Sequence, residues 1–200
     1  MEMIAFGVVS AAALIGLVGI LSIFDKKKGT GYYTPYGPDS TQAQRKQINR
    51  GAEQFFVGAG LMRKYKDRAL GGHEAREQAI KAWEESRSLG EARASTGLGN
   101  IAMSSGEDLA ARDLWREAAS KGDNAAELFI RVTAPSSTSR FSFEEAERAY
   151  LLAMTDQGFG EDVLQFAEIA RSVSMDSYSE QLILTAQQIR AARVRGPGGG

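Results

Sequence analysis

The sequence predicts an all-α protein, with a single transmembrane helix followed by an α-solenoid of antiparallel helical hairpins. Three observations indicate this fold: an uncharged stretch of 21 residues near the N-terminus, apolar residues at helical spacing from residue 41 onward, and glycines that interrupt this spacing at intervals. Proline is scarce, with 4 in 200 residues, while alanine, leucine and glutamate are abundant, which favours helices. No strand-like alternation of useful length is present.

The overall composition argues against several classes of function. The formal net charge is −1, so the whole chain gives no case for nucleic-acid binding. Cysteine is absent, which excludes a disulfide framework, a thiol nucleophile and a sulfur-based metal site, and fits a reducing compartment.

Residues 1–25 are predicted to anchor the chain in a membrane. Ile4–Phe24 carries no charge, and as a helix its 21 residues would extend roughly 30 Å, the thickness of the hydrocarbon core. A cleavable signal peptide would need a basic leader and small residues at the cleavage point, whereas the leader here is Met1-Glu2-Met3. A signal peptide and a buried core helix are the alternatives to a transmembrane helix.

The charges that flank this span predict its orientation. Lys26, Lys27 and Lys28 follow it directly, while Glu2 lies on the other side. Because basic residues are retained on the cytoplasmic side, we expect the N-terminus outside and the C-terminal domain in the cytoplasm. The three lysines are candidates for contact with the membrane surface.

Small residues within the span are candidates for packing against another transmembrane helix. Ala12 and Gly16 are four residues apart, with Gly19 close by, and residues of this size allow two helices to approach closely. The alternative is that these small residues have no specific packing role in the membrane span.

Residues 26–40 form a basic linker rich in glycine, proline and tyrosine. Glycine and proline at this density prevent regular structure. Its tyrosines, Tyr32, Tyr33 and Tyr36, either rest at the lipid headgroups, dock on a partner, or belong to a plain tether.

Residues 41–195 form the predicted helical domain, and residues 196–200 a flexible glycine-rich tail. Glycines stand where most of the helices should stop, and Ser142 with Glu145 predicts a capping box. The expected helices are Thr41–Leu70, Glu74–Leu89, Glu91–Ser104, Asp108–Lys121, Asn124–Val132, Phe143–Gln157, Glu161–Val173 and Ser177–Val194.

Three segments align on their closing glycines, Gly90, Gly122 and Gly158. Trp83, Trp115 and Leu151 then share one position, with spacings of 32 and 36 residues. A period of this size is typical of stacked helical hairpins. The alanines let helices lie close, the aromatic rings fill the space between hairpins, and the glycine makes the turn.

This pattern resembles the Sel-one-like branch of the tetratricopeptide-related repeats. The matching residues are Ala111, Trp115, Ala118, Ala119 and Gly122, with Leu98-Gly99 in the preceding helix. The resemblance covers Ala79 to Leu128 and implies a solenoid that binds other proteins. The following unit departs from it, because Met154 replaces an alanine and the loop Ala134–Ser142 interrupts the stack. A divergent helical bundle is the alternative architecture.

The sequence shows little that would support catalysis. The single histidine, His73, lies near Glu74 and Glu77, which would bind a metal weakly, and the start of a surface helix explains these residues better. No phosphate-binding loop and no serine nucleophile elbow are present. We therefore expect no enzyme activity, no cofactor and no metal.

Charge is distributed unevenly along the helical domain. Thr41–Leu70 holds seven basic and two acidic residues, whereas Phe141–Leu184 holds nine acidic and two basic ones. Such an arrangement would orient the domain against an anionic cytoplasmic leaflet. Ordinary solvated helix faces are the alternative.

Together these features predict a membrane-anchored accessory, assembly or scaffolding subunit of a larger membrane complex. The expected partners are other proteins, in particular integral membrane subunits. A regulatory or adaptor protein whose repeats face the periplasm or another extracytoplasmic space is the alternative. Repeat solenoids recognise ligands through exposed positions of their inner helices. The candidate partner-binding residues at such positions are Arg93, Asn100, Glu127, Arg131, Gln165 and Glu168.

Overall fold

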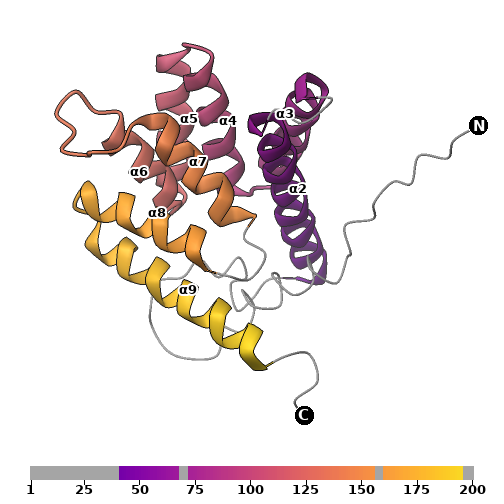
Figure 1. The fold of residues 1–200 in the computed structure, drawn as a ribbon. Helices are drawn as coiled ribbons and strands as arrows, with labels where there is room; N and C mark the ends of the chain where they lie inside the picture. The colour runs from indigo at the N-terminus through magenta and orange to yellow at the C-terminus, as the bar shows by residue number, and fades with distance from the viewer. Residues whose placement is uncertain (1–40, 68–71, 156–159, 196–200) are drawn as a thin grey trace, which may run out of the picture. The chain divides into compact units, whose positions relative to one another are not determined.

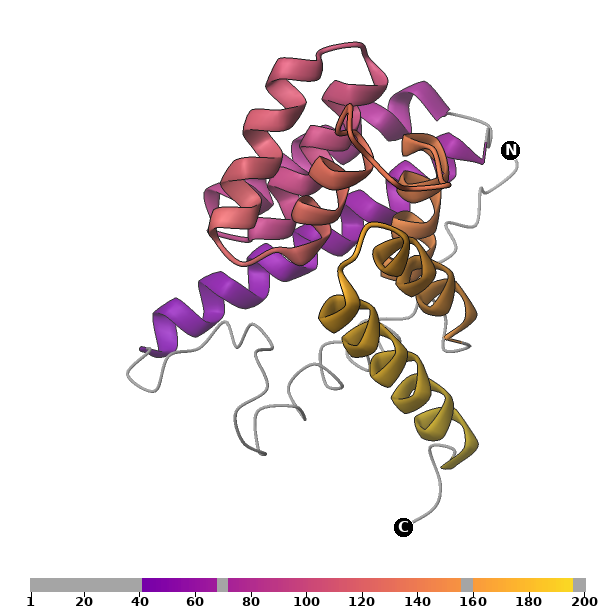
Figure 2. The same ribbon diagram turned by 90° about the vertical axis from the view of Figure 1, so that its left-hand side faces the viewer.

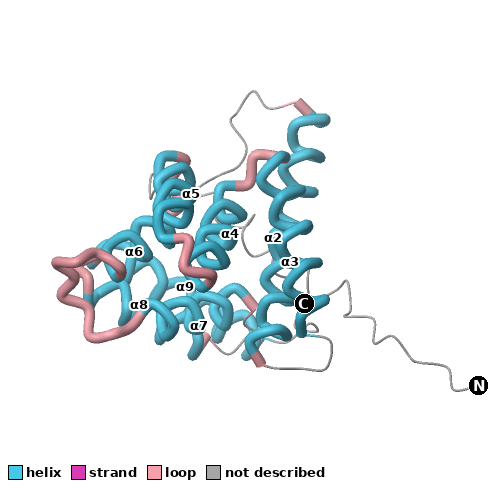
Figure 3. The backbone as a smooth tube through the Cα atoms, turned by 90° about the horizontal axis from the view of Figure 1, so that it is seen from above, coloured by secondary structure: helices cyan, strands magenta, loops and turns pink. Residues whose placement is uncertain are grey.

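The computed structural model describes residues 41–67, 72–155 and 160–195, and all regular secondary structure in these ranges is α-helical (Figures 1 and 3). The chain divides into two units, Met1–Arg45 and Lys46–Gly200, and the helices pack together within the second. The helices are α2 (Gln42–Lys66), α3 (Gly72–Ser88), α4 (Ala92–Ser104), α5 (Asp108–Ser120), α6 (Asn124–Val132), α7 (Phe143–Met154), α8 (Glu161–Ser172) and α9 (Asp176–Arg195).

The predicted anchor, linker and tail lie outside the described residues. The same holds for the candidate residues Ala12, Gly16, Gly19, Lys26, Lys27 and Lys28. None of the helices that are described combines the length and the apolarity needed to cross a membrane.

The eight helices predicted between residues 41 and 195 are all present, and their ends differ from the prediction by a few residues. Helix α3 begins at Gly72 rather than Glu74, and α2 ends at Lys66 rather than Leu70. Helix α7 ends at Met154 rather than Gln157, because Thr155 caps it. The Thr155 hydroxyl donates to the Leu151 carbonyl oxygen at 2.7 Å.

Local sequence signals set several of these boundaries. The predicted capping box is confirmed: the Ser142 hydroxyl accepts from the Glu145 backbone N–H, and the Glu145 carboxylate accepts from the Ser142 backbone N–H. Gly90 and Gly122 have φ angles of +91° and +90°, a left-handed conformation that residues with a Cβ rarely adopt. These two glycines therefore end α3 and α5 in the same way, 32 residues apart.

Each helix from α3 onward packs against the next one along the chain, and α4 also contacts α6. This order can be followed along the ribbon in Figure 2. Helix α2 lies beside α3, where the Ser86 hydroxyl donates to the Gly51 carbonyl oxygen at 2.7 Å. Nine of the 13 residues of α4 are buried, so this helix is covered on most of its circumference.

Trp83 of α3 packs between α2 and α4. Its side chain is 1% exposed, and its Nε1 donates to the Phe55 carbonyl oxygen at 3.0 Å. A Cβ on Gly58 would lie 2.4 Å from the ring nitrogen, and a Cβ on Gly97 would lie 2.8 Å from three ring carbons. The ring therefore fits only because both neighbouring helices present a glycine to it.

Trp115 of α5, 32 residues after Trp83, packs in a similar way. Its side chain is fully buried, and a Cβ on Gly99 would lie 2.5 Å from its Nε1. The ring stacks on Phe129 with centroids 5.6 Å apart and also contacts Phe143 at 6.0 Å. The predicted burial of Trp83 and Trp115 is confirmed.

Candidate interaction site

A buried polar contact connects the end of α2 to α7 and α4. Lys66 Nζ lies 2.6 Å from the Glu147 carboxylate, and the Ser104 hydroxyl lies 3.4 Å from the same oxygen. Arg63 reinforces the connection by donating to the Thr155 hydroxyl at 3.0 Å. The Glu147 side chain is 3% exposed and that of Lys66 is 34% exposed, so the acid is the buried member of the pair. Burial raises the pKa of Glu147, although Lys66 opposes this effect.

The unequal burial predicts unequal effects of removing the two partners. Lys66→Ala leaves a buried carboxylate without its counter-ion and should reduce the free energy of unfolding by about 2 kcal/mol. Glu147→Gln leaves only a partly solvated ammonium and keeps hydrogen-bonding capacity, so its effect should stay within about 1 kcal/mol. Denaturant unfolding of the full chain in neutral detergent measures both. Equal losses in the two variants would contradict this account of the contact.

Arg93, a predicted exposed residue, is instead largely covered. Its guanidinium makes two hydrogen bonds to the Glu91 carboxylate, at 2.8 and 2.9 Å. It also lies over the rings of Phe55 and Phe56 of α2, 4.6 and 5.2 Å from their centroids. Burial opposes ionisation of Glu91, but the contacts with Arg93 outweigh it and hold the pKa of Glu91 below its ordinary value. Arg93 thus holds α2 against the start of α4, and its predicted exposure is wrong because α2 covers this face.

Asn100 also proves to be a core residue rather than an exposed one. It is 2% exposed, and its Oδ1 accepts a hydrogen bond from Trp115 Nε1 at 3.0 Å. The prediction of exposure is wrong because α5 packs over the face of α4 that carries Asn100. This asparagine supports the tryptophan of the neighbouring helix and offers no surface to a partner.

The remaining candidates lie on α6 and α8 and are solvated. Gln165 and Glu168 are exposed, as is Arg131, while Glu127 is half-buried. Arg131 pairs with Glu127 at 2.8 Å, one helical turn away. Glu168 forms an ion pair with Arg140 of the loop before α7. Their part in partner binding stays a prediction.

Two acidic N-caps occupy equivalent positions directly after the turn glycines. Glu91 caps α4 and Asp123 caps α6, each accepting from the backbone N–H two residues on. Asp123 also accepts from the Thr96 hydroxyl at 2.5 Å, and burial raises the pKa of Asp123. The Tyr150 hydroxyl is buried without a hydrogen-bond partner in the described part of the chain. The two carboxylates thus hold the starts of α4 and α6, and the Tyr150 hydroxyl lies in the core.

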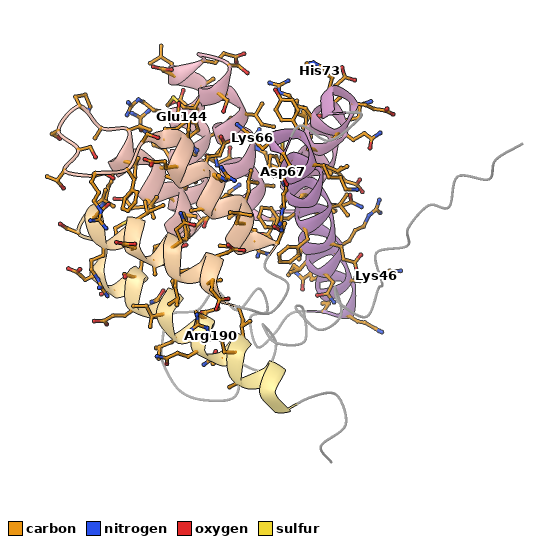
Figure 4. All side chains as sticks on the ribbon, viewed as in Figure 1. Lys46, Lys66, Asp67, His73, Glu144 and Arg190 are labelled. Atoms are coloured by element: carbon orange, nitrogen blue, oxygen red, sulfur yellow. The ribbon has the colours of Figure 1, made fainter. Side chains whose placement is uncertain are left out.

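A cleft of about 380 Å³ lies where α2, α3 and the end of α4 meet. Its lining residues are Met62, Tyr65, Lys66, His73, Arg76, Ile101, Ser104 and Ser105. Figure 4 labels Lys66 and His73, which α2 and α3 contribute. The rings of Tyr65 and His73 lie 6.3 Å apart, and Arg76 donates to the Ser105 hydroxyl at 2.9 Å.

Sequence reasoning weighed His73 as a weak metal ligand, preferred the start of a surface helix, and did not find this cleft. Within the described ranges, no cluster of three histidine, cysteine or acidic side chains is arranged to hold a metal ion. A usable signal was the combination of the single histidine and Arg76 in the first turns of one helix, after a strongly basic helix. The serines of α4 come from a segment about thirty residues away, and only the tertiary fold brings them there.

Comparison with family models, with curated proteins and with solved structures finds no match for this chain.

Proposed function

We propose that this chain is a single-pass membrane protein whose helical-repeat domain binds other proteins as an accessory, assembly or scaffolding subunit of a larger membrane complex. The observation that carries the proposal is the repeated packing of Trp83 and Trp115. Both occupy the same position relative to a turn glycine, and each ring is seated on a glycine of α4. Repeats of this kind form extended surfaces that recognise proteins.

The second part of the proposal is the membrane anchor. It rests on the uncharged residues Ile4–Phe24 and on the three lysines that follow them. The proposed topology places the N-terminus outside and the helical domain in the cytoplasm. A reporter fused after Gly200 should be active in the cytoplasm only; activity confined to the outside would favour the extracytoplasmic adaptor.

Isolation of the full chain in mild detergent tests the binding function. Integral membrane proteins should co-purify in reproducible proportions and survive a moderate salt wash. A protein that elutes alone under all conditions, from cells grown under several regimes, would count against the scaffolding role.

Charge reversal on the exposed face of α6 and α8 should separate binding from folding. The double variant Arg131→Glu, Glu168→Arg alters two solvated ion pairs, so the free energy of unfolding should change by less than about 1 kcal/mol. Association with the co-purifying partner should weaken, because opposed charges are replaced by like ones. The control is Asp113→Arg, Arg116→Glu on α5, which exchanges the two charges of another exposed ion pair. Equal retention of the partner by both variants would place the interface elsewhere.

A further inference from the structure

The cleft between α2, α3 and α4 has an unbalanced charge. None of its lining residues is acidic, whereas Lys66, His73 and Arg76 are basic. The charge of Lys66 is opposed by Glu147, 2.6 Å away, which does not line the cleft. Arg76 has only the neutral Ser105 hydroxyl as a partner, and the described residues supply it with no carboxylate within ion-pair distance. Among the described residues, one positive charge is therefore left without a counter-charge in a concave site.

The remaining lining groups define what else the occupant needs. Arg76 uses a single N–H toward Ser105 and retains its other donors. The Tyr65 hydroxyl and the His73 ring make no hydrogen bond to the described residues, so they too are available as donors. Met62 and Ile101 add apolar surface beside these polar groups. The site thus offers several donors and one uncompensated positive charge next to an apolar wall.

We infer that this cleft binds a carboxylate side chain of a partner protein, presented on a segment with an apolar residue beside it. The guanidinium fork of Arg76 matches the two oxygens of a carboxylate. A single carboxylate also matches the single uncompensated charge, whereas a dianionic phosphate would leave one negative charge unbalanced beside Glu147. This inference rests on the proposed function, since it names the chemistry by which a protein partner would be held.

The single histidine provides a direct probe of the cleft. His73 is the only histidine in the 200 residues, so its ring signals in an NMR spectrum report this site alone. The untagged full chain, labelled at histidine and held in phosphatidylcholine nanodiscs, is titrated with the peptide acetyl-Ala-Glu-Leu-Ala-amide. We expect a saturable shift of the His73 signals with this peptide. The matched peptide that carries Gln in place of Glu should bind with an apparent affinity at least about tenfold weaker.

Variants then test the role of the guanidinium. Arg76→Gln should lower the affinity for the Glu peptide at least about tenfold, and Arg76→Lys, which keeps the charge but loses the fork, should give an intermediate loss. Arg116→Gln, an equal charge change on the exposed face of α5, should leave the affinity within about twofold. Circular dichroism would reveal whether Arg76→Gln unfolds the domain. In that case the affinity of Arg76→Lys alone tests the role of the guanidinium.

Other outcomes would overturn the inference. These are the absence of a shift with the Glu peptide, an equal shift with the Gln peptide, and an unchanged affinity in both Arg76 variants. A shift of His73 in phosphatidylglycerol nanodiscs, with no response to the peptide, would assign the cleft to lipid headgroups instead. The titration needs no native partner, so its failure is distinguishable from failure of the proposed function, which the detergent isolation tests.

Discussion

Gly97→Ala is expected to destabilise the helical domain by about 2 kcal/mol or more, although alanine is the better helix former. In an open helix the same change would gain up to about 1 kcal/mol. Here the new Cβ would lie 2.8 Å from three carbons of the Trp83 ring. Inserting a methyl group into a packed core forces side chains or backbone to move, at a cost of about 1–3 kcal/mol and occasionally more.

The Trp83 ring has little room to move away from Gly97. Its Nε1 donates to the Phe55 carbonyl oxygen at 3.0 Å. On the other side, Gly58 of α2 lies so close that a Cβ on it would be 2.4 Å from the same Nε1. Relief therefore requires α2 and α4 to separate. That separation would also disturb the contact of Arg93 with Phe55.

A matched control exists on α2. A Cβ on Gly60 would meet no atom within 4 Å, so Gly60→Ala should be neutral or stabilising by up to about 1 kcal/mol. Thermal and denaturant unfolding of the full chain in neutral detergent, followed by circular dichroism, compares the two variants. Trp83→Phe combined with Gly97→Ala should recover part of the loss, since the smaller ring leaves room for the methyl group. Equal stability of the Gly97 and Gly60 variants would mean that the ring does not lie against α4.

The sequence was sufficient to predict the helices because their signals are local. The capping box at Ser142 and the turn glycines at Gly90 and Gly122 each act within a few residues of their own position. The shared position of Trp83 and Trp115 followed from comparing two segments of the same chain. Burial of both rings could therefore be predicted without knowing the path of α2.

The faces of α4 could not be assigned in the same way. Helical spacing indicates which residues share a face, but the number of neighbouring helices decides how many faces are buried. Helix α4 is covered by α2 on the side of Arg93 and by α5 on the side of Asn100. The sequence of α2 shows no repeat pattern from which its contact with α4 at Arg93 could be predicted. The cleft at Arg76 was missed for the same reason, since it forms only where side chains of three successive helices, α2, α3 and α4, come together.

Trp115→Ala should lower the free energy of unfolding by about 3–5 kcal/mol, among the largest effects expected in this domain. Loss of a buried tryptophan ring costs this amount through lost apolar burial and the cavity that remains. The ring is fully buried and stacks on Phe129, so the cavity would lie between α5 and α6. The Asn100 amide would also lose its hydrogen bond inside the core, where its Nδ2 has no partner among the described residues.

Two further variants divide this loss into its parts. Trp115→Phe keeps an aromatic ring but removes the Nε1 donor, so it should fall between the wild type and the alanine variant. Leu109→Ala, on the same helix, changes a side chain that is 80% exposed and should stay within about 0.5 kcal/mol of the wild type. For a domain of this size, a loss of 3–5 kcal/mol corresponds to a fall in melting temperature of about 6–20 °C. If Trp115→Ala melted together with Leu109→Ala, the repeat position shared by Trp83 and Trp115 would not be a packing position, and the proposed hairpin register would be wrong.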